Sequence, residues 1–264
     1  MGADLNVGSA DRASSPTATS YGALATRFYD ADKPIAGVAE LDWYRKRLPR
    51  DAGPVLEAMA GSGRLLLPLA AAGYRMHGVD TSESMLASCA ARLRHAGREA
   101  PLFRQNIAAL NLPFRYSAAF VAAGSLQLLT ARDQLRDALA CLRAHLVDPA
   151  VLLLDLFVPD AALHPPGAPI VEFRNVALAD GSQVMHRCET AADAKHRRIL
   201  CMSRYERRVA GQIVERDDET VVFTWHGEDE MTALLRDAGY REVRIEPPAW
   251  PRGDGHSYGV SARA

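Results

Sequence analysis

The chain of 264 residues lacks several features that would place it in a specialised class of protein. Its four cysteines form no C-x-x-C pair, so we expect reduced thiols, no metal site and a cytoplasmic protein. The apolar runs are far shorter than the roughly 18–20 residues of a membrane helix, and the opening residues contain no apolar signal core. We therefore expect neither secretion nor a membrane partner.

An excess of positive charge is also missing. The 31 basic and 32 acidic residues leave a net charge of −1, which argues against a nucleic-acid partner. Because 48% of the residues are hydrophobic, the chain can bury a sizeable core, as one large domain or as a domain with an insertion.

What the sequence does contain is a nucleotide-binding pattern that ends at Asp80. It is half of a βαβ unit, in which glycines let the backbone and a ligand approach closely. The acid at the end can take the two hydroxyls of a ribose. The parts are a strand at Val55–Ala60, a glycine turn at 61–63, a helix at Arg64–Ala72 and a second strand at Arg75–Val79.

Two positions in this pattern depart from a dinucleotide site. Leu66 replaces the third glycine of G-x-G-x-x-G, and Glu57 lies inside the first strand. A carboxylate there would repel a pyrophosphate, whereas it suits a cation. These departures disfavour NAD and favour S-adenosylmethionine (SAM), which has a ribose at one end and an ammonium and a sulfonium at the other.

At these residues the sequence resembles the class I SAM-dependent methyltransferases of small molecules. VLEAMAGSGR matches the family's acid followed by G-x-G, and GVDTSESML matches its second acid and the helix after it. The resemblance covers about residues 20–158 and 226–264. It implies an α/β fold, a Rossmann-like sheet of seven strands with helices on both faces. The SAM-binding residues that it implies are Tyr21, Tyr29, Glu57, Gly61, Gly63, Asp80, Thr81, Met85, Asn106, Ile107, Ala123 and Ser125.

Asn106 is a departure from the family pattern. The family usually has an acid there, which takes the adenine amino group, and the next apolar residue, here Ile107, packs on the ring. An amide oxygen can still accept this hydrogen bond, but it carries no charge.

The segment before the motif predicts a disordered start followed by two helices. Residues 1–18 are small and polar, so we expect them to be disordered. Tyr21–Ala31 and Val38–Arg47 have helical patterns. The resemblance implies that the first helix is a lid that brings Tyr21 and Tyr29 against bound SAM. The alternative is that both tyrosines simply pack at an interface.

Helical and apolar segments alternate after the motif, which predicts a parallel sheet. We place the SAM-binding core with its lid at 19–158 and the end of the core at 226–264. The expected helices are Ser82–Gly97, Ala131–Leu146 and Glu228–Ala238, and the expected strands are Pro101–Gln105, Ala118–Ala123, Ala150–Val158, Tyr240–Ile245 and Ser257–Ala264.

Residues 159–225 have a different character. Segments with alternating or β-branched residues, separated by turn signals, predict an antiparallel β insertion. By the resemblance, this insertion covers the active site and shapes the acceptor pocket. Its expected strands are Ile170–Leu178, Gln183–Thr190, Arg197–Val209 and Gln212–Trp225.

We predict that the chain transfers a methyl group from SAM to nitrogen or oxygen of a small metabolite. No base is evident, because Gln127 stands near the place where some small-molecule N-methyltransferases have a histidine. Our candidates for the acceptor pocket are Gln127, Tyr205 and His226. On a two-residue period His186 shares a face with Cys188, so it is a further candidate.

Two alternatives stay open. One is an enzyme that releases methylthioadenosine from SAM, by intramolecular cyclisation or by transfer of the aminocarboxypropyl group. The other is a SAM-binding module without catalysis. The sequence names neither the acceptor nor the oligomeric state, for which a homodimer is one possibility.

Overall fold

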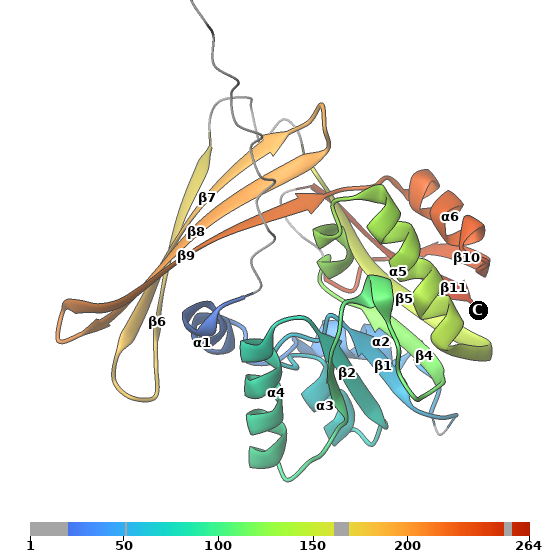
Figure 1. Cartoon of the computed structure of the whole chain (residues 1–264), viewed down its shortest axis with the longest axis horizontal. Coiled ribbons are helices and arrows are strands. Elements are labelled where there is room, and N and C mark those ends of the chain that lie inside the picture. Colours follow the sequence, from blue (N-terminus) through green and yellow to red (C-terminus); the bar gives the residue numbers. More distant parts are fainter. Residues whose placement is uncertain (1–20, 51, 161–168, 251–254) are drawn as a thin grey trace, which may run out of the picture.

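The computed structural model describes residues 21–50, 52–160, 169–250 and 255–264. The segment 1–18, for which disorder is expected, lies outside the described residues. Two sheets make up the structure, one of seven strands and one of four (Figure 1). Within the described residues, no helix is long and apolar enough to cross a membrane.

The seven-stranded sheet confirms the expected α/β class. Its strand order is β10-β11-β5-β4-β1-β2-β3, and all of these strands except β11 run in the same direction. Every residue of β1 and β4 is buried, as expected for central parallel strands covered on both faces. The bounds are β1 Val55–Ala58, β2 Met76–Asp80, β3 Leu102–Arg104, β4 Tyr116–Val121, β5 Leu146–Pro159, β10 Arg241–Glu246 and β11 Gly255–Arg263.

Helices cover both faces of this sheet. Successive β1 residues pack into different apolar clusters, Val55 with α2, α3 and α4, and Leu56 with α5 and α6, because strand side chains alternate between faces. The helices are α1 Ala23–Asp32, α2 Val38–Arg45, α3 Leu66–Ala71, α4 Glu83–His95, α5 Arg132–His145 and α6 Glu228–Asp237, and the short 3₁₀ turns are η1 Ile107–Ala109 and η2 Ser125–Leu128.

The helix after the glycine turn is shorter than the sequence pattern predicts. We expected it from Arg64, but α3 begins at Leu66. Pro68 has no N–H to donate to the Arg64 carbonyl, which instead accepts a hydrogen bond from the Ala36 backbone at 3.0 Å. The Arg64 carbonyl, which no helix hydrogen bond uses, therefore links the glycine turn to the segment before α2.

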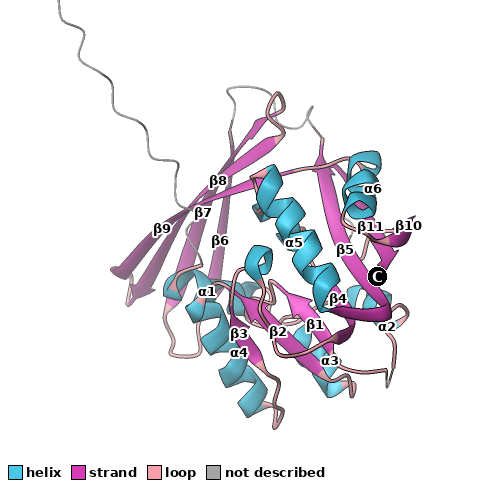
Figure 2. Cartoon of the chain, turned by 45° about the vertical axis from the view of Figure 1, so that its right-hand side comes forward, coloured by secondary structure: helices cyan, strands magenta, loops and turns pink. Residues whose placement is uncertain are grey.

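The insertion is the second sheet, four antiparallel strands in the order β6-β7-β8-β9. In Figures 1 and 2, α1 lies between this sheet and α4, and it contacts both. Leu24 and Phe28 of α1 form a separate apolar cluster with Val184 and Tyr205 of the insertion. The bounds are β6 Ile170–Ala177, β7 Gln183–Asp193, β8 Arg198–Val209 and β9 Gln212–Thr224.

Candidate active site

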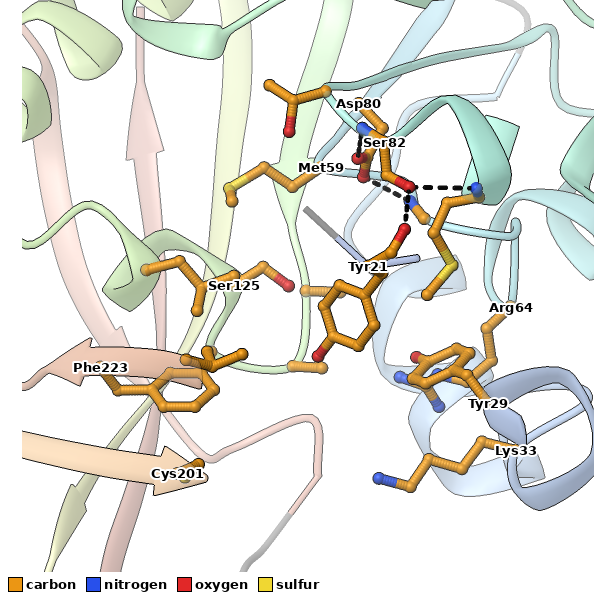
Figure 3. Close-up of a pocket in the computed structure, with 18 of the residues that line it drawn as sticks. Tyr21, Tyr29, Lys33, Met59, Arg64, Asp80, Ser82, Ser125, Cys201 and Phe223 are labelled. Carbon is orange, nitrogen blue, oxygen red and sulfur yellow. Dashed lines mark hydrogen bonds between the residues drawn. The ribbon is translucent and has the colours of Figure 1, made fainter. Parts of the chain in front are cut away.

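A cavity of approximately 870 Å³ lies where the carboxyl ends of the core strands face the insertion. In an open α/β sheet this edge is where ligands bind. The glycine turn, α1 and the inner face of the insertion sheet all contribute lining residues. In Figure 3, Tyr21 lies near the centre of the view, between Asp80 on one side and Ser125 and Phe223 on another.

Asp80 is held rigidly at the end of β2. The Gly61 backbone N–H donates to its Oδ2 at 2.8 Å, and the Ser82 N–H donates to its Oδ1 at 2.8 Å. Each carboxylate oxygen can accept further bonds, and Asp80 lines the cavity together with Thr81. Two oriented oxygens are what the two hydroxyls of a ribose require.

Gly61 and Gly63 have different roles in the turn. Gly61 lines the cavity at φ +54°, and a Cβ there would meet only Met85 Sδ at 3.8 Å. Gly63 is not among the lining residues. At φ +81°, its added Cβ would lie 2.6 Å from the sulfur of Cys89. Gly61 therefore leaves room for a ligand, whereas Gly63 leaves room for α4 to pack.

Glu57 is a buried acid that faces the cavity. Its side chain is 3% exposed, and among the described residues its Oε2 has no hydrogen-bond partner. Burial raises the pKa of Glu57 to about 8, against the opposing effect of the Arg64 cation. An unpartnered carboxylate oxygen in a low-dielectric site fits a cation such as the ammonium of SAM.

Two cations in the cavity lining were not predicted from the sequence. The Arg64 guanidinium donates to both oxygens of Glu40 at 2.6 Å and lies 4.9 Å from the ring of Trp250. Lys33 Nζ lies 5.1 Å from the same ring, and both cations line the cavity. Both cations can attract the carboxylate in the methionine part of SAM. The position of Arg64 directly after G-x-G is a sequence signal that could have identified it. No motif around Trp250 indicates that its ring lies in the cavity.

The cavity lining also contains the groups expected around an adenine. Met85, Asn106 and Ile107 line it, and Met59 is an additional apolar side chain. Asn106 Oδ1 accepts a hydrogen bond from the Ala108 backbone at 2.9 Å, which caps η1. The amide oxygen that we assigned to adenine is thus partly used by the turn itself, leaving one lone pair.

The two lid tyrosines line the cavity, and their rings meet edge to face with 6.2 Å between centroids. The Tyr21 carbonyl accepts from Ser82 Oγ at 2.7 Å, which ties the start of α1 to the cofactor turn. On the other side, Glu219 of β9 accepts from the Gly22 N–H at 2.6 Å. The lid is therefore anchored to the core and to the insertion. Ala123 and Ser125, the other SAM candidates, also line the cavity.

Two of the three acceptor candidates lie outside the cavity lining. The Gln127 amide accepts from the Phe157 N–H and donates to the Phe157 carbonyl, both at 2.9 Å, and it also donates to Thr224 at 3.3 Å. Gln127 therefore links β5 to β9 and does not face an acceptor. His226 lies 3.4 Å from Glu230 on α6, away from the cavity. Spacing alone could not show which way these side chains point.

Tyr205 does line the cavity, in the company of residues whose position depends on strand pairing. His186 stacks on its ring with 4.5 Å between centroids, and Phe28 of α1 packs against both rings. Burial raises the pKa of Tyr205, so its phenol is neutral at physiological pH. The remaining polar side chains of this wall are Glu172, Arg174, Cys188, Arg198, Cys201, Ser203 and Thr220.

Residues 55–148 match a family model described as a methyltransferase domain. This segment contains the glycine turn, Glu57 and Asp80, and it is the part of the chain that builds the cofactor end of the cavity. It is a class I SAM-dependent methyltransferase domain. The cofactor is SAM, and the residues present fit it, because Asp80 would accept from the hydroxyls of its ribose and the unpartnered oxygen of Glu57 would accept from its ammonium.

Solved structures share the fold of this methyltransferase over nearly all of its length. The sugar N-methyltransferase KedS8 from Streptoalloteichus has a TM-score of 0.73 at 18% identity, covering 99% of both chains. A SAM-dependent methyltransferase from Clostridium acetobutylicum has a TM-score of 0.70 at 15% identity, covering 89% of this chain and 96% of its own.

A third similar structure was solved with SAM bound. CalS10, an amino pentose methyltransferase from Micromonospora echinaspora, has a TM-score of 0.62 at 21% identity, covering 90% of this chain and 92% of its own. No curated protein matches the sequence. At these identities the structures show that the fold is shared, including the β insertion.

Proposed function

We propose that this methyltransferase acts on a small polar metabolite, with an amine nitrogen as the preferred acceptor and a hydroxyl oxygen as the second candidate. The observation that carries the proposal is the single cavity that joins the SAM-binding residues to the inner face of the insertion sheet. Donor and acceptor can meet there inside the protein.

When bound, SAM supplies a methyl group that its sulfonium has already activated. The task of the chain is then to orient the partners and exclude water. Asp80 and Gly61 orient the ribose, Glu57 holds the ammonium, and the lid tyrosines shield the reacting end. Orientation of this kind can contribute about 7–11 kcal/mol in favourable cases.

Three observations favour an amine of a small molecule. The acceptor wall is polar, with Glu172, Arg174, His186 and Ser203 facing the cavity. An amine is nucleophilic as soon as it is neutral, whereas a hydroxyl needs a base to take its proton during the transfer. Among the similar structures, KedS8 is a sugar N-methyltransferase and CalS10 an amino pentose methyltransferase.

The test is product analysis with a defined panel. The purified chain is incubated with SAM and with D-glucosamine, D-galactosamine, their methyl glycosides, and the corresponding sugars that carry a hydroxyl in place of the amine. We expect S-adenosylhomocysteine and a singly methylated amino sugar by mass spectrometry. Methylation of the hydroxy sugars alone would refute the preference for an amine.

The same panel separates the two alternative functions. Methylthioadenosine as the product would indicate cyclisation or aminocarboxypropyl transfer. Binding of SAM with no product from any member of the panel would contradict the proposed acceptor class and favour a binding module. Asp80→Ala serves as the inactive control, because it removes the ribose contact.

The homodimer and the cytoplasmic location stay predictions. Light scattering of the purified chain tests the first.

A further inference from the structure

Two polar side chains on the inner face of the insertion sheet form a hydrogen-bonded pair that has no role in binding SAM in the site described above. His186 of β7 and Ser203 of β8 line the cavity, and His186 Nε2 lies 2.9 Å from Ser203 Oγ. Ser203 is registered opposite Cys188, two residues from His186, so strand pairing places both side chains on one face.

In the loop after β4, Gln127 stands where a histidine base could stand. The amide of Gln127 is engaged by three backbone groups of β5 and β9, and an amide takes no proton at neutral pH. Of the histidines that the structure describes, His186 alone lines the cavity. A proton from the acceptor therefore has one imidazole within the cavity wall to receive it.

The ring of His186 is held in a fixed orientation. Tyr205 stacks on one side of it at 4.5 Å with an interplanar angle of 9°, and the ring of Phe28 lies 4.8 Å away. Tyr205 covers one face of the ring, Phe28 packs beside both rings, and Nε2 lies within hydrogen-bond distance of Ser203 Oγ. A ring fixed in this way can keep one tautomer, with its proton on Nδ1.

We infer that Ser203 and His186 form a proton relay that removes the proton from the acceptor amine, and this inference rests on the proposed function. The acceptor ammonium gives a proton to Ser203 Oγ while the Ser203 hydroxyl proton passes to His186 Nε2. The freed lone pair forms the N–CH₃ bond as the S–CH₃ bond breaks, with its electron pair staying on sulfur. The proton then leaves the imidazolium to solvent.

Neighbouring groups on five elements influence this imidazole. Of these, Glu219 and the Arg174–Asp32 ion pair at 2.9 Å are charged, and Cys188 and Tyr205 are titratable. They lie on β7 (Cys188), β8 (Tyr205), β9 (Glu219), β6 (Arg174) and α1 (Asp32). The pH profile is therefore compared between variants that leave all of these groups in place.

The experiment measures kcat/KM against pH for His186→Gln, Ser203→Ala and Ser203→Thr. The acceptor is the amino sugar that the wild-type chain methylates fastest in the panel above. We expect His186→Gln and Ser203→Ala to lower kcat/KM at least about tenfold at pH 6, with the loss shrinking to less than about threefold at pH 9, where solvent supplies the free amine. Ser203→Thr keeps the hydroxyl and should retain activity.

The control is His196→Gln, which changes an exposed histidine in the turn between β7 and β8. It should leave the profile unchanged. Because His186 packs against Tyr205 and Phe28, its variant is checked by thermal unfolding and by SAM affinity. Loss that is equal at pH 6 and pH 9, or full activity of Ser203→Ala, would refute the relay while the wild-type methylation still supports the proposed function. If the wild-type chain methylates no amine, both fail.

Discussion

Because burial raises the pKa of Glu57, we expect SAM binding to release a proton from this carboxyl. Its pKa is raised to about 8 by burial, so at pH 7 only about one-tenth of the unliganded chain carries the charge that an ammonium needs. Ionising the group costs about 1.4 kcal/mol at pH 7 and about 2.7 kcal/mol at pH 6. The Kd for SAM should therefore fall about tenfold between pH 6 and pH 7.

The perturbation is Glu57→Gln, which keeps the shape of the side chain and removes its titration. A hydrogen bond to a charged partner contributes about 1.5–3 kcal/mol, which the ionisation cost cancels at pH 6 but not at pH 7.5. The variant should bind SAM with nearly the wild-type Kd at pH 6 and about tenfold more weakly at pH 7.5. Measurements stop at pH 7.5, because α-amino groups lose their own proton near pH 7.7–8.0.

The assay is titration calorimetry in buffers of different ionisation enthalpy. The wild-type chain should release about 0.9 protons per SAM at pH 7, and Glu57→Gln close to none. Glu83→Gln, at an exposed position of α4, is the matched control and should behave as wild type. A wild-type Kd that is the same at pH 6 and pH 7, with no buffer-dependent heat, would refute the reasoning.

The same pKa shift has a consequence for the stability of the unliganded chain. Between about pH 4.5 and pH 8 the native carboxyl holds a proton that the unfolded one has lost, so the native state binds more protons. The free energy of unfolding should decrease as pH rises through this window. Glu57→Gln should lack this contribution, and denaturant titrations of both chains at pH 5 and pH 8 measure the difference.

Three further predictions concern the frame of the site. Asp80→Asn should weaken binding of S-adenosylhomocysteine about 10- to 100-fold in calorimetry, because it removes a charged acceptor of the ribose hydroxyls; unchanged affinity would contradict that role. Gly63→Ala should lower the free energy of unfolding by about 1–3 kcal/mol in urea, whereas Gly37→Ala, with open space around its Cβ, should change it by less than about 0.5 kcal/mol. Gln127→Ala should lower the free energy of unfolding by about 2–4 kcal/mol, because it leaves the buried backbone groups of Phe157 without their hydrogen-bond partner. The exposed Gln212→Ala is the control, and an equal loss in both variants would argue against the link between β5 and β9.

The donor half of the site could be predicted because its signals are local. Glu57, Gly61 and Asp80 lie at the ends of two successive strands, and parallel pairing of β1 with β2 necessarily brings those ends together. The backbone conformation of a glycine turn and the position of an acid after a strand follow from a short segment. The SAM assignment therefore needed no tertiary information.

The acceptor half could not be predicted in the same way. Gln127 and His226 stand at positions from which a side chain could reach an acceptor, yet one is drawn to the backbone of β5 and β9 and the other lies away from the cavity. A single residue does not determine which partner it meets, because that depends on how a distant element packs.

By itself, the sequence determined the class of the fold, the existence of the antiparallel insertion and the identity of the donor, because periodicity, turn residues and the acid–glycine–acid spacing act over a few neighbouring residues. Only the tertiary structure decided that Arg64 and Lys33 meet at the ring of Trp250 in the cavity wall, and that His186 faces Ser203 inside the cavity. These contacts join residues far apart in the chain, and strand register and the docking of α1 against the insertion bring them together.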